Sequence, residues 1–198
     1  MRTSITKTKL IGLLLALPGW PIPSAAQIDG CIHLSKPEFQ IEYRPDLGVP
    51  AGVFWSVSRE DIGNAQRSPS WRFKTDKETP KPRVKSNMYL RSGFQRGHMC
   101  PAADRSANTK LMRSTFIMSN VCPMTQALNT GAWKRWEEKE RRIAREKGQC
   151  FVIAAPIFFP IDTTWIGDRH VAVPHAFLKI IYGHHPDTLY GMALIENR

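Results

Sequence analysis

The chain has 198 residues, with 28 lysines and arginines against 17 aspartates and glutamates, and a formal net charge of +11. This length fits one domain with a sizeable hydrophobic core and argues against a second domain. The positive charge concentrates polyanions near the surface and makes their binding sensitive to salt, although a solubility charge explains the composition equally well.

Residues 1–26 have the features of a secretory signal peptide. The charged region contains Arg2, Lys7 and Lys9, and a short apolar run follows from Leu10 to Leu17. A small-residue cleavage site, Ser24-Ala25-Ala26, then precedes Gln27. The apolar run is too short to span a bilayer. We therefore expect cleavage, a secreted or periplasmic domain of residues 27–198, and no stable membrane association; a retained anchor is the alternative. The removed segment holds three cations and no acid, which lowers the net charge from +11 to +8.

Several segments have the apolar pattern of β-strands. Residues 39–43 and 53–58 alternate apolar and polar side chains on either side of a turn-rich stretch, which predicts two strands. Residues 150–157 form a continuous apolar run typical of a central strand, with Pro156 at its end. Further strands are predicted at residues 171–173, 177–182 and 189–195.

Residues 59–92 are polar, basic and interrupted by prolines. Nine lysines and arginines are interleaved there with Trp71, Phe73 and Tyr89. Guanidinium groups grip phosphates and flat rings stack on bases, so this composition suits a nucleic acid. A solvated loop that is merely basic is the alternative.

The segment that follows carries the residues with the clearest chemistry. Arg96, Gly97 and His98 place a fixed cation beside a titratable imidazole, with a glycine that allows close approach of a substrate to the backbone. We expect residues 93–99 to leave a loop and enter a strand that presents His98. Residues 108–113 can form a short helix, and residues 115–120 have the apolar run of a buried strand that ends at Asn120.

The strongest predicted helix begins at a cap at Asn129 or Thr130 and ends before Gly148. Helical spacing places Asn129, Trp133 and Glu137 on one face. The same face continues through Glu140, Ile143 and Ala144, and two i,i+4 ion pairs, Glu137–Arg141 and Glu138–Arg142, are expected. A carboxylate on a face that bears a tryptophan requires a partner, which favours a functional role for Glu137 over that of a surface glutamate.

Four cysteines remain after cleavage of the signal, at positions 31, 100, 122 and 150. Export permits disulfides, and three pairings are possible. Cys100 and Cys122 each follow the end of a predicted strand by two residues, which makes a bridge between them plausible; reduced core cysteines are nearly as good an explanation.

Three ordered motifs resemble the DNA/RNA non-specific endonuclease family, which includes secreted bacterial sugar-non-specific nucleases and mitochondrial endonuclease G. They are Arg96-Gly97-His98-Met99-Cys100-Pro101-Ala102-Ala103-Asp104, Ser119-Asn120-Val121-Cys122-Pro123, and Asn129-Thr130-Gly131-Ala132-Trp133-Lys134-Arg135-Trp136-Glu137. The resemblance covers roughly residues 39–197. It implies an α+β, ββα-metal (His-Me finger) fold, in which two strands carry His98 and Asn120 and a helix carries Asn129 and Glu137. This unit is expected to be set on a central antiparallel sheet flanked by helices.

The resemblance also implies an exported Mg²⁺-dependent endonuclease that cleaves DNA and RNA without marked sequence specificity, and it allows a homodimer. His98 is expected to be the general base, because a neutral imidazole is available near pH 7. An amide and a carboxylate suit Mg²⁺, which keeps several waters; Mn²⁺ or another divalent ion can substitute. The remaining roles are assigned by resemblance. Asn129 is expected to be the direct metal ligand, and Glu137 to hold a metal-bound water. Arg96 is expected to contact the phosphate, and Asn120 to orient His98 or the metal shell. Arg72 is expected to be the upstream arginine on the scissile phosphate, with Arg67 as the alternative.

One position departs from the family motif, because Gln95 stands where an aspartate is usual. A neutral, longer side chain is expected to lower activity, so the alternative function is a catalytically impaired nucleic-acid-binding homologue. A basic exported module that binds anionic envelope polymers is a third possibility, supported only by charge. A zinc site from His98, Cys100 and Cys122 is a weaker alternative to Mg²⁺, since the spacing lacks a paired zinc knuckle. No regular ligand spacing relates His170, His175, His184 and His185, which are expected to be ordinary surface or core histidines.

The C-terminal end raises a further expectation. Family members usually continue past the segment that resembles residues 194–197, so the sequence is either a compact variant or a fragment. A fragment is expected to leave an edge of the sheet uncovered.

Overall fold

A computed structural model describes residues 30–159, 163–184 and 188–198. The predicted signal peptide and His185 lie outside the described residues. No helix among the described residues is long and apolar enough to cross a membrane.

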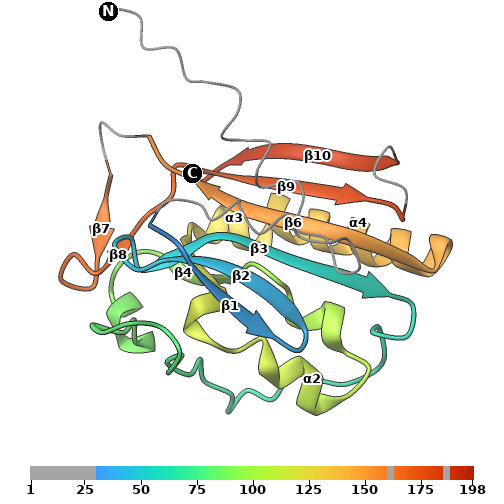
Figure 1. The fold of residues 1–198 in the computed structure, drawn as a ribbon, viewed down its shortest axis with the longest axis horizontal. Helices are drawn as coiled ribbons and strands as arrows, with labels where there is room; N and C mark the ends of the chain where they lie inside the picture. The colour runs from blue at the N-terminus through green and yellow to red at the C-terminus, as the bar shows by residue number, and fades with distance from the viewer. Residues whose placement is uncertain (1–29, 160–162, 185–187) are drawn as a thin grey trace, which may run out of the picture.

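The centre of the molecule is a six-stranded sheet in which all neighbouring strands are antiparallel (Figure 1). Its order is β1-β2-β3-β6-β9-β10, with bounds Ile32–Lys36, Phe39–Arg44, Val49–Ser58, Gln149–Ile157, Ala176–Tyr182 and Leu189–Glu196. The predicted strands at 39–43, 53–58, 150–157, 177–182 and 189–195 are confirmed, as is the central place of β6. Pro156 lies next to the end of β6, where it disturbs the ladder least.

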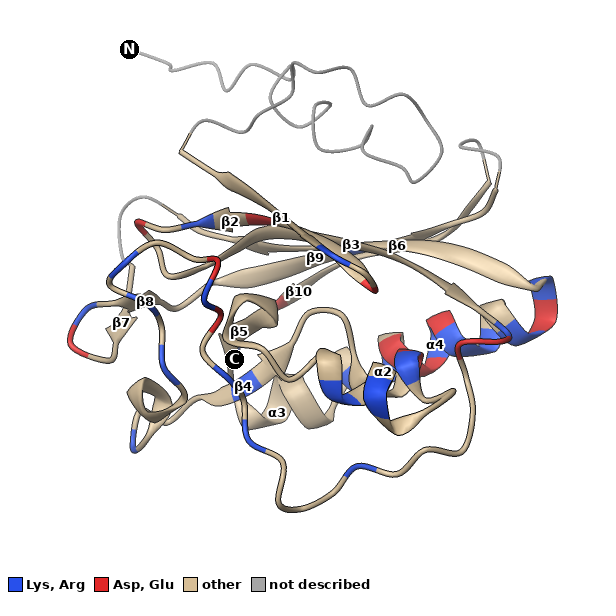
Figure 2. Ribbon diagram, turned by 60° about the horizontal axis from the view of Figure 1, so that its bottom comes forward, with Lys and Arg blue, Asp and Glu red and all other residues tan. Residues whose placement is uncertain are grey.

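A smaller ββα unit carries the motif residues. Strands β4 (Gln95–His98) and β5 (Val121–Met124) pair antiparallel with His98 opposite Val121. Helices α3 (Gln126–Thr130) and α4 (Ala132–Lys147) follow β5 directly, and the three labelled helices lie on one side of the large sheet (Figure 2). The remaining elements are η2 (Ser86–Tyr89), η3 (Ala102–Arg105), α2 (Thr109–Ser114), η4 (Met118–Asn120), β7 (Trp165–Ile166) and β8 (Val171–Ala172). The predicted short helix at 108–113 is α2, with Asn108 as its cap, and the predicted strand at 171–173 is β8.

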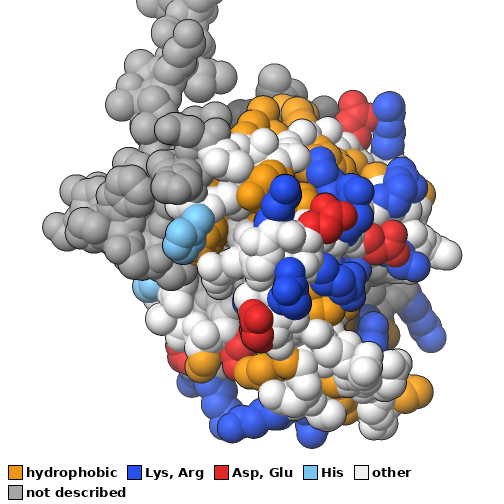
Figure 3. All heavy atoms as spheres, turned by 90° about the vertical axis from the view of Figure 1, so that its right-hand side faces the viewer, with side chains coloured by type: hydrophobic (Ala, Val, Ile, Leu, Met, Phe, Trp, Pro, Cys, Tyr) orange, Lys and Arg blue, Asp and Glu red, His pale blue; other side chains and the backbone are white. Residues whose placement is uncertain are grey.

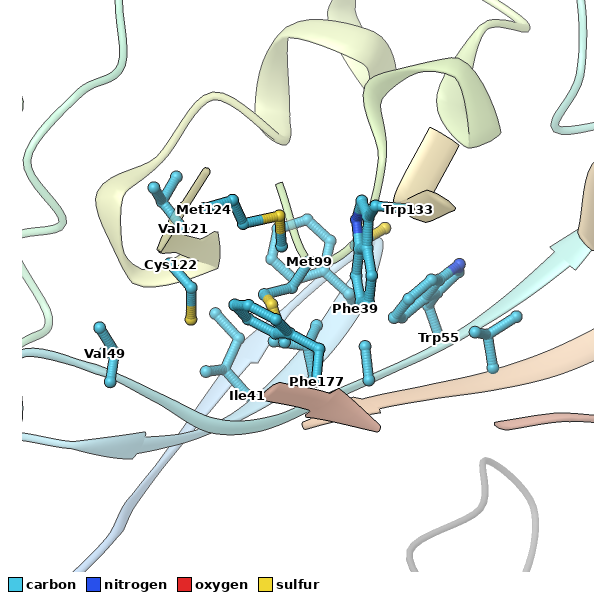
Figure 4. Packing of buried hydrophobic residues seen from close by; sticks show 14 of the residues in the cluster. Phe39, Ile41, Val49, Trp55, Met99, Val121, Cys122, Met124, Trp133 and Phe177 are labelled. Carbon is cyan, nitrogen blue, oxygen red and sulfur yellow. The ribbon is translucent and has the colours of Figure 1, made fainter. Parts of the chain in front are cut away.

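The hydrophobic core lies between the large sheet and the ββα unit. Side chains from the sheet such as Ile41, Trp55 and Phe177 point toward Met124 of β5 and Trp133 of α4 (Figure 4). The rings of Trp133 and Phe177 are 5.3 Å apart, and neither side chain is exposed. Because burial of a large aromatic side chain contributes several kcal/mol of transfer free energy, this contact fixes α4 against the sheet.

Two sequence predictions about the ββα unit are wrong. Residues 115–120 do not form a strand, because η4 occupies their second half and β5 begins only at Val121. Local hydrogen bonds explain this: the Asn120 side chain bonds to the backbone of Cys100, and Ser119 donates to buried Asp76 at 2.6 Å. The long helix does not begin at Asn129 or Thr130 either, since Gly131 separates α3 from α4. A Cβ at that glycine would lie 2.3 Å from the Ala127 carbonyl oxygen, so the tight junction requires glycine.

The expected ion pairs along α4 are replaced by others. Glu138 pairs with Lys134 at 3.8 Å rather than with Arg142. Arg141 reaches across to Asp104 at 3.0 Å rather than to Glu137. Asp104 is fully buried and also accepts a hydrogen bond from the Trp55 indole at 2.9 Å. A buried carboxylate needs a charged partner, which explains why Arg141 pairs with Asp104.

All four cysteines are free and buried, so the suggested Cys100–Cys122 bridge is not formed. Burial raises the pKa of Cys31 to about 11 and raises the pKa values of the other three thiols further. We therefore expect a thiol reagent such as DTNB to modify none of them in the native protein and all four in denaturant. Rapid labelling of any thiol under native conditions would contradict this packing.

Candidate active site

One cavity, of about 540 Å³, brings together residues from β4, α3, α4 and the connection between β3 and β4. His98, Asn129 and Glu137 all line it, so the three residues on which the sequence prediction depends share one site. The wall also holds a group of cations: Arg67, Lys134, Arg141 and Arg145. A hollow with this lining suits a small anion held next to an imidazole.

Two aromatic rings and one backbone hydrogen bond hold His98 in place at the cavity. The rings of Phe73 and Phe116 each lie 4.8 Å from the imidazole, and the Trp133 indole donates to the His98 carbonyl at 3.0 Å. The Nε2 atom of His98 is buried and has no hydrogen-bond partner among the described residues. A buried polar atom without a partner is costly, so this nitrogen at the edge of a cavity is a candidate for a functional group.

Burial, reinforced by the nearby charge of Arg67, lowers the pKa of His98 to about 3. The imidazole is therefore neutral in the folded protein near pH 7, which leaves it free to accept a proton. The same shift makes it a weak base, and a phosphate anion bound beside it would raise its pKa by offsetting the charge of Arg67.

This shift predicts how stability changes with pH. Because the imidazole has an ordinary pKa of 6.5 when unfolded, its contribution is fully present above pH 6.5 and is lost as the pH falls toward 3. Between pH 7 and pH 5 we expect the free energy of unfolding to fall by about 2 kcal/mol more in the wild type than in His98→Gln. Urea unfolding of both proteins in the presence of a chelator measures the difference, and equal losses would contradict the low pKa.

Asn129 and Glu137 approach the cavity from different helices. The Asn129 amide nitrogen donates to Gln95 Oε1 at 2.7 Å, which leaves the Asn129 oxygen available as a ligand. Burial raises the pKa of Glu137 to about 7; Lys179 opposes this shift, and Asp104 adds to it. A divalent cation beside Glu137 would favour the carboxylate form.

These donors fit magnesium better than zinc. No group of three or more histidines, cysteines or acids that could hold a metal occurs among the residues that the structure describes. An amide oxygen and one carboxylate suit an ion that keeps most of its waters, and space for these waters exists in the cavity. Cys100 and Cys122 are fully buried and do not line the cavity, so they offer no zinc ligand there.

Of the two candidate upstream arginines, the structure brings Arg67 to the cavity. Its guanidinium lies 4.8 Å from the centre of the Phe116 ring, beside His98. Arg72 is exposed, does not line the cavity, and donates to the carbonyls of Pro69 and Trp71 at 2.7 and 3.1 Å. The segment between β3 and β4 has no helix or strand periodicity, so its sequence could not show which of the two arginines faces the cavity.

Arg96 and Asn120 are placed as supports of the site. Arg96 donates from Nε to the Ser86 carbonyl at 3.0 Å and lies over the Tyr89 ring, and it does not line the cavity. Asn120 is fully buried; its side chain accepts from the Cys100 amide at 2.9 Å and donates to the carbonyls of Cys100 and Thr115. Both therefore fix the backbone on either side of His98 rather than reach into the cavity.

The sequence analysis missed three cations of the cavity wall. Lys134, Arg141 and Arg145 follow the helical spacing of α4 together with Glu137, so their position on one face was readable. The face of the molecule that carries the C-terminal end of α4 shows lysine and arginine side chains with acidic ones among them (Figure 3). Exposed cations that are mixed with acids in this way are typical of a solvated surface.

Comparison with known proteins identifies the family. Residues 24–195 match the family model described as DNA/RNA non-specific endonuclease. A nuclease from Nostoc sp. is 30% identical over 156 residues, 78% of this chain and 56% of the relative. Mitochondrial endonuclease G from Bos taurus is 30% identical over 178 residues, 83% of this chain and 57% of the relative. The chain thus spans about half the length of these relatives.

The fold has a solved counterpart. A crystal structure of the EndoG/EndoGI complex matches with a TM-score of 0.77 and 26% sequence identity, covering 98% of this chain and 82% of that one. The large antiparallel sheet and the ββα unit are therefore those of a known ββα-metal fold. Because the family model matches residues 24–195, which is most of this chain, the chain belongs to the DNA/RNA non-specific endonuclease family.

Proposed function

We propose that the protein is an exported, Mg²⁺-dependent endonuclease that hydrolyses phosphodiester bonds of DNA and RNA without marked sequence specificity. The observation that carries this proposal is one shared cavity, in which a His98 nitrogen without a hydrogen-bond partner among the described residues shares a wall with Asn129, Glu137 and four cations. Such a wall offers contacts to phosphates, which carry no sequence information.

The roles of the residues follow from their geometry. His98 takes a proton from the attacking water, since its ring is neutral and locked in place. Arg67, fixed over Phe116, stabilises the negative charge that develops on the phosphate oxygens. Asn129 and Glu137 would hold the metal ion, which supplies Lewis-acid stabilisation of the leaving oxygen when bound. Cleavage that leaves 5′-phosphate ends is expected from the family.

The metal dependence is tested directly by digestion. Purified residues 27–198 are incubated with plasmid DNA and with RNA, with Mg²⁺ and with a chelator. Cleavage of both substrates that stops with the chelator supports the proposal, whereas cleavage unaffected by the chelator would overturn the role given to Asn129 and Glu137.

A substitution at Gln95 tests whether the protein is an active enzyme or a catalytically impaired homologue. Its contact with Asn129 supports activity, because Gln95 orients the amide that holds the metal. We expect Gln95→Leu to raise the Mg²⁺ concentration needed for half-maximal cleavage by about 10-fold or more. Titration of the rate with Mg²⁺ measures this, with Gln66→Leu as the control, since Gln66 lines the cavity but has no hydrogen bond to Asn129. A wild type that binds nucleic acid but never cuts it would favour the impaired homologue instead.

Export follows from the proposed signal peptide. Expression of the full chain with its own N-terminus, followed by mass measurement of the extracellular or periplasmic protein, is expected to show a mature chain that begins at Gln27. Retention of residues 1–26 in the cytoplasm would contradict export without affecting the proposed chemistry.

A further inference from the structure

A second cavity, of about 820 Å³, lies in the connection between β3 and β4. Four cations line it, namely Lys77, Lys81, Arg83 and Lys85, together with Thr75, Pro82 and Met88. None of these residues lines the cavity of His98. We call these four cations the 77–85 cluster.

The 77–85 cluster has no counter-charge. Among the described residues, none of the four cations forms an ion pair, and no acid lines the cavity. The nearby carboxylate of Glu78 is taken by Lys36 at 2.7 Å. Four like charges around one hollow repel one another, so a bound anion would relieve the repulsion.

The loop that displays the cluster is rigid. Arg83 donates to the carbonyls of Thr79 and Lys77, both at 2.9 Å, and Thr79 is buried with its hydroxyl bonded to the Asp76 carbonyl. Val84 is buried in the main core. An anion that binds here therefore finds the Arg83 guanidinium, and the backbone that carries the three lysines, already ordered, which lowers the entropic cost of binding.

The cluster is continuous with the active site along the chain. Phe73 packs on the ring of His98, and Lys74 is tied to residues 116 and 118 by two backbone hydrogen bonds of 2.9 and 2.8 Å. Lys77 lies four residues beyond Phe73, so their Cα atoms are separated by at most about 14 Å. This distance corresponds to about four nucleotide steps along one strand. Lysines and arginines recur along this connection, part of which is drawn below α2 and α3 in Figure 2.

We propose that the 77–85 cluster is a second phosphate-binding site, which holds the polynucleotide a few nucleotides away from the bond that is cut. This inference rests on the proposed function. It adds that the enzyme favours long chains, because only a chain that reaches both cavities gains from the cluster.

The test is a triple substitution, Lys77→Gln, Lys81→Gln and Lys85→Gln, compared on substrates of different length. All three side chains are exposed, so their replacement is compatible with folding. For an oligonucleotide of about 30 nucleotides we expect binding weaker by about 10-fold and a slope of log K against log salt reduced by about 2 to 3. For a dinucleotide with one phosphodiester bond, whose single phosphate cannot occupy both cavities at once, kcat/KM is expected to stay at the wild-type value.

A matched control removes three other exposed cations, Lys110→Gln, Arg142→Gln and Lys147→Gln, which line neither cavity. If both triple variants lose the same binding affinity for the long substrate, net charge alone explains the loss and the proposal is overturned. Equal losses of the 77–85 variant on long and short substrates would overturn it as well.

Binding measured in the His98→Ala background with a chelator separates this inference from the proposed function. If the wild type fails to cut any nucleic acid, the proposed function fails. A loss of binding on neutralising the 77–85 cluster in that background would still support the second site, and unchanged binding would overturn it.

Discussion

Replacing His98 with alanine is expected to lower the rate of phosphodiester cleavage by about 10² to 10⁴-fold while leaving the binding of nucleic acid close to the wild-type level. The reason is that no other described group can take over as base: Glu137 is the only acid in the cavity lining, and it is assigned to the metal. The cations that bind phosphate are untouched by the substitution. Single-turnover cleavage of a plasmid gives the rate, and fluorescence anisotropy in the presence of a chelator gives the affinity.

The matched control is His33→Ala. His33 is half exposed and pairs with Glu42 on the strands β1 and β2, outside the lining of either cavity. It should keep the wild-type rate. A His98→Ala protein that cuts at the same rate as this control would refute the role of the imidazole, whereas equal loss of binding and cleavage would show that the substitution acts on the fold.

The site could be predicted from sequence where short-range rules apply. His98, Asn129 and Glu137 were chosen from the family motifs and from helical spacing, and all three line one cavity even though Asn129 and Glu137 belong to different helices. The exact start of the helix was not predictable, because the break at Gly131 depends on the close approach of the Ala127 carbonyl. Asn129 nevertheless reaches the cavity from α3.

The positions of the arginine side chains depend on long-range contacts. The choice between Arg67 and Arg72 is made by a ring, Phe116, which lies more than forty positions further along the chain. Arg96 is drawn to the Ser86 carbonyl, and nothing in its own motif signals that partner. Secondary-structure patterns predict where a strand lies, but they do not predict which distant carbonyl or ring its side chains meet.

Nothing in the sequence indicated the buried ion pair between Lys179 and Glu140 either. Lys179 lies in the apolar strand β9 and Glu140 on the inner face of α4, and both are fully buried. Their charged atoms are 2.9 Å apart, and the Lys179 ammonium lies 4.4 Å from the centre of the Trp133 ring. Since Trp133 donates to the His98 carbonyl, the pair supports the strand that presents the imidazole.

Lys179→Met is accordingly expected to lower the free energy of unfolding by about 3 to 5 kcal/mol. Burial raises the pKa of Glu140 and Lys179 opposes that shift, so removal of the lysine leaves a carboxyl group that must be buried without its partner. The double variant Lys179→Met, Glu140→Gln removes the charge as well and is expected to recover most of the loss, because it leaves no unpaired ion. Urea unfolding at pH 7 compares the three proteins. If the double variant is no more stable than Lys179→Met alone, the loss of stability comes from packing around Trp133 and not from the unpaired carboxyl group of Glu140.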